Sequence, residues 1–210
     1  MTTLAIMKAD IADDFSRTDL TSVIADAITK AITFYQPSNF WFNESRSETF
    51  STVASQPRYT KTDDTSIGQI IGLDSLVITD GGQNRELKRI DPLEYELFVD
   101  NSASTGAPYS FTYYEQTIGL YPIPDIVYSI RMFGRIKKAA PATDAETDNV
   151  WMVEGYELIR SRAAADVAAV KVRDYEFAQF MTAKELREAD RLRAETSKRI
   201  ASGQIVATTF

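Results

Sequence analysis

The stretch that decides the fold is Phe34-Tyr35-Gln36-Pro37-Ser38-Asn39-Phe40-Trp41-Phe42-Asn43-Glu44, where a helix gives way to a β-rich region. Ahead of Pro37, apolar residues recur at i, i+3 and i+4 spacing, which predicts a helix with one buried face. These residues are Leu20, Val23, Ile24, Ala27, Ile28, Ala31, Ile32 and Tyr35. Pro37 ends the helix, because proline lacks an N–H and disfavours the α conformation in the residue before it.

The aromatic run after Pro37 is too apolar for an ordinary surface loop. We predict that Phe40, Trp41 and Phe42, together with Tyr35, form a buried core where the helices meet the sheet. The alternative is a platform on which bases or sugars stack. The sequence around the run contains no basic patch, so burial is favoured.

The residues before this helix predict a first short helix and a turn. The apolar edge of the first helix consists of Leu4, Met7, Ile11 and Phe15. Ser16 and Asp19 are three residues apart and come just before the next apolar run. This spacing predicts a capping box that starts the second helix.

Residues 40–135 consist of short runs rich in Thr, Ser, Tyr, Phe and Ile, separated by turn residues, which indicates β-structure. Asp80-Gly81-Gly82-Gln83 lies between two such runs and predicts a hairpin, because glycine tolerates positive φ. Asp91-Pro92 predicts an N-cap followed by proline at the first helical position. We expect a helix of one to two turns from there to about Phe98.

The C-terminal region has a helical pattern from about residue 150 to about residue 202. Alanines between 163 and 169 predict a slim helix that approaches a neighbouring backbone closely. Thr182-Ala183-Lys184-Glu185 predicts a capping box, and therefore a break near residues 177–182. The apolar stripe of the last helix is thin and consists of Leu186, Ala189, Leu192 and Ile200. Because so thin a stripe gains little from burial within one chain, we expect contacts from elsewhere.

Together these elements predict an α+β protein. Its helical body is built from the N- and C-terminal helices, and a mainly antiparallel β domain is inserted between them. The predicted bounds are 1–37 and 150–202 for the helical body, 38–135 for the β-rich insert, 136–149 for a polar connector and 203–210 for an extended tail. The tail has the composition of a strand but no partner strand beside it in the sequence.

Composition excludes several kinds of chemistry. The chain has no Cys and no His, so Cys/His zinc sites, cysteine nucleophiles, a Ser-His-Asp relay and disulfides are ruled out. The formal net charge of −7 argues against tight, sequence-independent binding of nucleic acid, which needs clustered cations. We recognise no signal peptide and no run of about 20 apolar residues that would span a bilayer. We expect a soluble protein with no membrane partner.

The remaining patterns for catalysis or ligand binding are weak. Glu44 and Glu48 would share a face of an extended strand, like a catalytic carboxylate pair, but nothing around them indicates a sugar cleft. Asp74, Asp80 and Asn84 lack the ligand spacing of a calcium loop. No glycine motif matches a phosphate-binding loop, and no Ser-x-x-Lys occurs. We therefore predict no catalytic residue, no metal and no cofactor.

Several motifs follow one another between about residues 20 and 135. They are the helix from Ile24 to Ile32 that leads into Phe40–Glu44, the strand Thr49–Val53 with Tyr59, the segment Arg85–Asp91 with the helix at Leu93-Glu94-Tyr95, and Gly106–Tyr109 continuing to Ile118–Asp125 and Tyr128. In order and spacing, this series resembles the head-to-tail adaptor (connector) proteins of short-tailed, DNA-packaging bacteriophages.

The resemblance implies a structural virion protein without enzyme activity. It implies a homo-oligomeric ring of about twelve copies beneath the portal protein, continuing the DNA channel towards the tail. The implied partners are further copies of the chain, the portal protein, downstream tail or nozzle proteins, and double-stranded DNA that passes without specific binding. The implied location is the head–tail junction of the virion, after assembly in the host cytoplasm.

A ring requires one face of each copy to dock on the opposite face of the next copy. The C-terminal region suits this requirement. We predict that contacts with neighbouring copies or with the portal involve Arg187, Arg191, Leu192, Arg193, Ile205, Val206 and Phe210. The tail would add a strand to a neighbour's sheet edge or dock on the portal.

Two other functions stay open on the sequence. A carbohydrate-binding β module, or a glycosidase-like β domain, would use Phe40 and Trp41 as an aromatic platform with Glu44 and Glu48 beside it. Another tail or baseplate component would share the fold class and differ in its partner.

Overall fold

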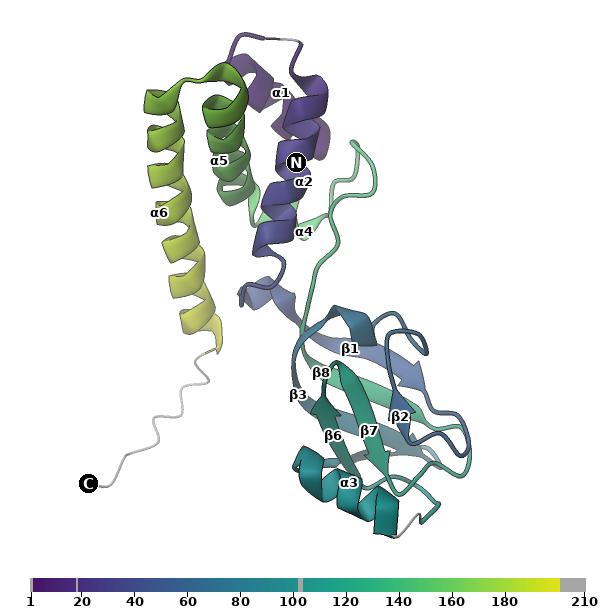
Figure 1. Cartoon of the computed structure of the whole chain (residues 1–210). Helices are drawn as coiled ribbons and strands as arrows, with labels where there is room; N and C mark the ends of the chain where they lie inside the picture. The colour runs from purple at the N-terminus through teal and green to yellow at the C-terminus, as the bar shows by residue number, and fades with distance from the viewer. Residues whose placement is uncertain (1, 18, 102–103, 201–210) are drawn as a thin grey trace, which may run out of the picture. The chain divides into compact units, whose positions relative to one another are not determined.

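The computed structural model describes residues 2–17, 19–101 and 104–200. Its contacts divide the chain into two compact units (Figure 1). The helical unit comprises Met1–Phe42 and Lys138–Phe210, and the β unit comprises Asn43–Lys137. Helices come from both ends of the chain and the sheets from its middle, which confirms the predicted α+β class. That the two units are the domains expected from the sequence stays a prediction.

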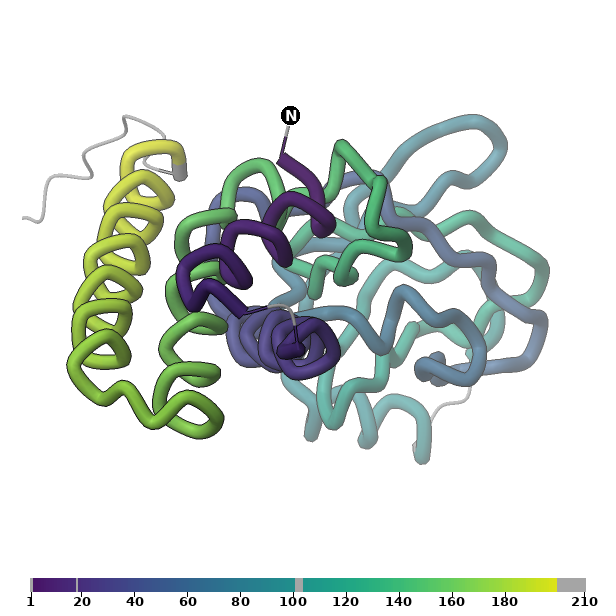
Figure 2. The backbone as a smooth tube through the Cα atoms, turned by 90° about the horizontal axis from the view of Figure 1, so that it is seen from above, coloured from purple at the N-terminus to yellow at the C-terminus, as the bar shows by residue number. Residues whose placement is uncertain are grey.

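In the helical unit, α5 lies between α2 and α6 and contacts both (Figure 1). The short first helix, α1, contacts α2 and α5 (Figure 2). The helices of this unit are α1 (Leu4–Asp14), α2 (Thr21–Tyr35), α4 (Val150–Val153), α5 (Tyr156–Val167) and α6 (Tyr175–Ile200), with a π-helical turn at Ala168–Val172 between the last two.

The small side chains of α5 explain its central position. Ala163 and Ala164 are fully buried, so the neighbouring helices approach the α5 backbone closely. Helix α2 follows the predicted periodicity and ends at Tyr35, two residues before Pro37. Its buried face consists of Ile24, Ala27, Ile28, Ala31, Ile32 and Tyr35.

The predicted capping box at the start of α2 is wrong. The N-cap of α2 is Leu20, and no side chain accepts a hydrogen bond there. Ser16 adopts a φ of 49°, and Asp19 instead pairs with Arg17, whose Nη2 lies 2.5 Å from an Asp19 carboxylate oxygen. Because the Asp19 carboxylate pairs with Arg17, it does not accept a hydrogen bond from the first turn of α2.

The predicted break near residues 177–182 is also wrong, because α6 is continuous through them. Thr182 does not cap a helix; its hydroxyl donates to the Ala178 carbonyl at 2.9 Å within α6. The chain breaks earlier, at Arg173, which adopts the left-handed conformation. Asp174 follows and accepts a hydrogen bond from the Phe177 N–H at 3.0 Å, as an N-cap side chain does.

The buried face of α6 differs from the predicted apolar stripe. Ala189 and Leu192 are buried as expected, but Leu186 is 59% exposed on another side of the helix. The α6 residues that are buried in the unit are Ala178, Met181, Glu185, Ala189, Leu192 and Thr196. Two of these are polar, so the sequence pattern understates how much of the helix is covered. The side chain of Ile200 and the predicted tail at 203–210 lie outside the residues described.

The β unit consists of two four-stranded sheets. One has the order β1-β8-β3-β4 and is antiparallel throughout. The other has the order β2-β7-β6-β5, with one parallel pair between β5 and β6. The strands are β1 (Glu44–Ser51), β2 (Arg58–Tyr59), β3 (Ile70–Asp80), β4 (Gln83–Glu86), β5 (Lys88–Arg89), β6 (Ser110–Tyr114), β7 (Thr117–Tyr121) and β8 (Ser129–Ile136), and 3-10 turns lie at Trp41–Asn43 and Ile67–Gln69.

Alternation along β6 and β7 gives their sheet two buried faces. Phe111, Ile118 and Leu120 join one apolar cluster with residues of the other sheet, such as Leu76 and Ile130. The opposite face is partly covered by α3 (Pro92–Asn101), whose Tyr95 packs with Ile90 and Tyr121. The sheet therefore lies between the other sheet and α3.

Two local predictions for the β unit are confirmed. Gly81 and Gly82 have φ angles of 54° and 80° and join β3 to β4, with Asp80 opposite Gln83. Asp91 caps α3 by accepting a hydrogen bond from the Leu93 N–H at 2.9 Å. The helix then runs three residues beyond the expected end at Phe98.

We predict that Gly134→Ala destabilises the β unit, because a Cβ there would lie 2.3 Å from the Gly72 carbonyl oxygen. Gly134 is on the central strand β8, where register shifts occur on both sides, so the backbone has little freedom to move away. We expect the free energy of unfolding to fall by about 2–4 kcal/mol, measured by urea denaturation followed by circular dichroism.

The matched control is Ser129→Ala, an exposed position on the same strand, with an expected change within about 0.5 kcal/mol. Equal effects of the two substitutions would show that the close approach at Gly134 is absent.

Candidate interaction surfaces

The described residues contain no group of three or more His, Cys, Asp or Glu side chains that could hold a metal ion. None of the described helices is long and apolar enough to cross a membrane.

The aromatic run lies in the core of the helical unit. Phe40 and Phe42 are 1% and 7% exposed, and their ring centroids are 5.3 Å apart. Phe42 also meets the Trp151 ring edge-on at 5.3 Å, and Tyr35 lies 6.1 Å from Phe40. These side chains are internal packing, so the alternative of a stacking platform for sugars or bases is wrong. Their predicted meeting with the sheet stays a prediction.

Trp41 joins the last turns of α6 to the segment before β1. Its backbone N–H donates to the Thr196 hydroxyl at 3.1 Å, and the Arg199 guanidinium lies 3.7 Å from the centroid of its ring. A cation over the face of an indole ring is favourable and covers that face. Trp41 is therefore a support for α6 rather than a ligand platform.

Glu44 and Glu48 do not form a carboxylate pair in a cleft. A register shift on β1 between Ser45 and Glu48 interrupts the alternation on which a shared face depends. The hollow that Glu48 lines has a volume of about 10 Å³, room for about one water molecule and far too little for a sugar. The glycosidase-like alternative is thus contradicted by the geometry around these two residues.

A buried carboxylate connects α2, α5 and α6. Glu185 on α6 is 7% exposed, and one of its oxygens accepts two hydrogen bonds. The Tyr35 hydroxyl donates from α2 at 2.6 Å, and Arg162 donates from α5 at 2.7 Å. The Arg162 guanidinium also lies 3.5 Å from the centroid of the Phe34 ring. A buried charge is tolerated only when it is paired and hydrogen-bonded in this way.

This arrangement changes the ionisation of Tyr35. Burial, followed by the hydrogen bond to Glu185 and the charge of that carboxylate, raises the pKa of Tyr35 well above its ordinary range. The phenol therefore stays protonated and keeps donating its hydrogen bond at alkaline pH.

The predicted contact residues on α6 lie in different environments. Arg187, Arg191 and Arg193 are exposed. Arg191 pairs with Glu188 and Glu195, and Arg193 pairs with Asp190. For Arg187 there is no ion pair with any described residue. Leu192 is 1% exposed and enclosed within the helical unit, so we leave it out of the proposed contacts. The remaining predicted contacts, Ile205, Val206 and Phe210, lie outside the residues described.

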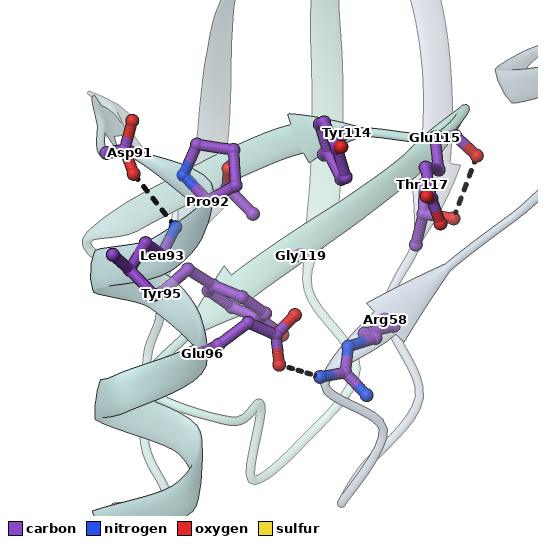
Figure 3. A pocket seen from close by; sticks show the side chains of 11 residues that line it. Arg58, Asp91, Pro92, Leu93, Tyr95, Glu96, Tyr114, Glu115, Thr117 and Gly119 are labelled. Atoms are coloured by element: carbon purple, nitrogen blue, oxygen red, sulfur yellow. Dashed lines mark hydrogen bonds and ion pairs between the residues drawn. The ribbon is translucent and has the colours of Figure 1, made fainter.

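The β unit has a groove that was not predicted from the sequence. The groove runs between α3 and the hairpin of β6 and β7, has a volume of about 660 Å³, and is called the acidic groove here (Figure 3). Its lining residues are Arg58, Asp91, Pro92, Leu93, Tyr95, Glu96, Thr112, Tyr114, Glu115, Thr117 and Gly119. In the view of Figure 3, Asp91 and Glu115 lie at the two ends of its upper rim, with Pro92 and Tyr114 between them.

Strand pairing explains why these side chains face the groove. Thr112 is opposite Gly119, and Tyr114 is opposite Thr117, so all four lie on the face of the sheet that α3 partly covers. A Cβ at Gly119 would lie 2.6 Å from the Tyr95 ring. The glycine is what lets Tyr95 lie across the floor, where its hydroxyl donates to the Pro57 carbonyl at 2.9 Å.

A charge pattern in the sequence would have indicated the groove. Residues 91–130 contain no Lys or Arg, whereas their acidic residues are Asp91, Glu94, Glu96, Asp100, Glu115 and Asp125. Among the lining residues, the only positive charge is Arg58, which pairs with Glu96. The segment therefore gives the groove a negative rim.

The chain combines a helical unit, an inserted β unit, the acidic groove and a helix α6 with a charged outer side. A sequence model of the SU10 adaptor protein family matches residues 2–206. Because the match covers nearly the whole sequence, the chain belongs to the SU10 adaptor protein family. No curated protein sequence matches the chain.

Family membership confirms the predicted resemblance to phage head–tail adaptors. It makes the chain a phage structural protein of the head–tail junction, associated with head or portal proteins and with tail proteins. Such a role needs surfaces for partners.

We predict that Tyr35→Phe lowers the free energy of unfolding by about 1.5–3 kcal/mol at neutral pH, because it removes a buried hydrogen bond to a carboxylate. The deficit should shrink at alkaline pH. Above the unfolded pKa of about 10, ionisation of Tyr35 stabilises the unfolded wild-type chain and so lowers the free energy of unfolding. The native phenol, with its raised pKa, stays neutral at this pH. At about pH 10.5 the gap between wild type and variant should be smaller by roughly 0.8 kcal/mol.

Urea denaturation at the two pH values measures both effects. Tyr175→Phe serves as the control, because Tyr175 is 64% exposed and lies on α6, the helix that carries Glu185. A gap that stays constant with pH would contradict the raised pKa of Tyr35.

Proposed function

We propose that the chain is a head–tail adaptor that assembles as a closed ring of identical copies on the portal, extends the DNA channel and links the head to the tail. Family membership supports the adaptor role. The structural observation that carries the finer proposal is the unsatisfied side of α6. This helix of 26 residues buries one face in the helical unit and exposes the large side chains Phe180 and Leu186, at 62% and 59%. Arg187, next to Leu186, forms no ion pair with any described residue.

A ring of identical copies needs two different surfaces on each copy, because the contact between neighbours must be head-to-tail. We assign these two roles to the outer side of α6 and to the acidic groove. The proposed copy number, about twelve, follows from the resemblance to portal-bound connectors and not from the geometry of a single chain.

The charge of the chain suits a conduit for DNA. With a formal net charge of −7, its surface repels the phosphate backbone overall, so DNA passes without being held. We propose no reaction chemistry for the protein, and the function assigned to it is mechanical and architectural.

The direct test is to mix the purified protein with rings of the cognate portal protein and to image the product by electron microscopy. We expect a ring of added density on one end of the portal, absent from portal alone. A chain that stays monomeric in the presence of portal rings contradicts the proposal. Binding to a purified tail component but not to the portal would instead favour the alternative of a tail or baseplate protein.

We further predict that deleting residues 204–210 leaves the thermal unfolding midpoint unchanged and weakens incorporation onto portal rings. The deletion removes none of the contacts of the described core, so folding should not depend on it. Differential scanning calorimetry and the co-sedimentation of chain with portal measure the two effects. A lower unfolding midpoint of the truncated chain in isolation would contradict this assignment.

A further inference from the structure

We propose that the acidic groove of one copy receives the outer face of α6 from a neighbouring copy, with Arg187 as the side chain that enters the groove. The inference rests on the proposed ring and specifies one contact that would build it. It assigns a partner to a groove, on the β unit, that the resemblance to connectors does not single out.

Charge is the first argument. The groove rim carries Asp91, Glu96 and Glu115. Arg58 neutralises Glu96 through an ion pair. For the carboxylates of Asp91 and Glu115, there is no ion pair with any described residue. The groove therefore keeps an excess of negative charge and favours a cation from outside.

Aromatic surface is the second argument. Tyr114 on the rim is 61% exposed. A guanidinium group stacks favourably on a tyrosine face and binds carboxylates with its edge. A groove that combines Tyr114 with Asp91 and Glu115 is thus suited to an arginine side chain.

An unsatisfied hydroxyl is the third argument. Thr112 is 5% exposed and lies on the groove face of the sheet, opposite Gly119. Its Oγ1 has no hydrogen-bond partner among the described residues. Buried hydroxyl groups without partners are rare, because their desolvation is not compensated. The hydroxyl is itself covered, so an arginine in the groove, with its five N–H donors, supplies the missing bond if Thr112 turns its hydroxyl towards the groove.

The outer face of α6 has the matching features. Phe180, Ala183 and Arg187 share that face, since they are three and four residues apart. Arg187 has no described ion pair, and Arg191 follows one turn later with the same charge. Arg191 is already paired with Glu188 and Glu195, so Arg187 is the one of these two arginines that has no partner among the described residues. Ala183 leaves space between Phe180 and Arg187, so the surface of α6 can approach the groove.

Size is consistent with this contact. The groove volume of about 660 Å³ is in the range of sites that enclose a small ligand, so it accommodates an arginine with part of a neighbouring side chain. The groove belongs to the β unit and α6 to the helical unit, so they are two different surfaces of the chain. A contact between them in separate copies is head-to-tail and can be repeated around a ring.

Charge reversal tests the contact in the full-length chain. We expect Arg187→Glu and Glu115→Arg each to weaken assembly on portal rings by about tenfold or more, measured by titrating chain against portal. Both residues are exposed, so the fold should be kept, as circular dichroism and thermal unfolding would verify. The controls are Arg46→Glu on β1 and Glu86→Arg on β4, two exposed positions outside both surfaces, and we expect neither to change assembly.

Mixing the two variants separates a contact between copies from a contact within one copy. In an equal mixture of Arg187→Glu chains and Glu115→Arg chains, each interface can be either the native pair or the reversed pair. We expect the mixture to recover most of the wild-type assembly, although each variant alone does not. The double variant should recover it as well.

The absence of cysteine in the natural chain allows a second measurement. Arg187→Cys and Glu115→Cys, placed in separate chains with different tags and mixed on portal rings, should form a disulfide between the two chains on mild oxidation. A cysteine at Ser129 paired with Arg187→Cys is the control and should not cross-link.

The outcomes separate this inference from the proposed function. If wild-type chains assemble on the portal and the two reversals have no effect, the ring stands and this contact is overturned. If the reversals weaken assembly but neither the mixture nor the double variant restores it, Arg187 and Glu115 meet different partners and the contact is again overturned. If wild-type chains do not assemble at all, the ring and this contact fail together.

Discussion

The carboxylate of Glu185 is the interaction on which the helical unit depends. It lies on α6, is almost fully buried, and is held by Tyr35 from α2 and Arg162 from α5. These three helices come from opposite ends of the sequence. A buried carboxylate that loses a partner costs several kcal/mol, so the network fixes the rotation of α6 about its axis. That rotation decides which residues of α6 face inward and which, like Arg187, face outward.

The parts of the fold that depend on local chemistry could be predicted from the sequence. The stripe of α2, the Gly81-Gly82 turn and the cap at Asp91 each follow from a few adjacent residues. Prediction failed where a side chain had a distant partner. Glu185 has the spacing of a capping-box glutamate, yet it binds Tyr35, which lies 150 positions away in the chain. The left-handed turn at Arg173 has no sequence signal, because a non-glycine residue rarely adopts that conformation.

The surfaces were harder to predict than the fold for a related reason. The residues that line the acidic groove come from a short strand at Arg58, a helix at Asp91–Glu96 and a hairpin at Thr112–Gly119. Only the pairing of β6 with β7 and the packing of α3 bring them together. Their shared negative charge is visible in the sequence, but its meaning requires the geometry. For the arginines of α6, the sequence indicates where they lie on the helix. Only the structure shows that Arg191 and Arg193 already form ion pairs.

The insertion of the β unit has a mechanical consequence. The chain enters this unit at the start of β1 and leaves it at the end of β8, and these two strands are antiparallel neighbours, with Glu44 opposite Arg135. Both covalent tethers therefore leave from the same end of one strand pair. A force that pulls on both tethers acts on β1 and β8 in the same direction, along their axes. Separating β8 from its other neighbour β3 by such a force requires many ladder hydrogen bonds to break together. The β unit is therefore joined to the helical unit by two covalent links instead of one.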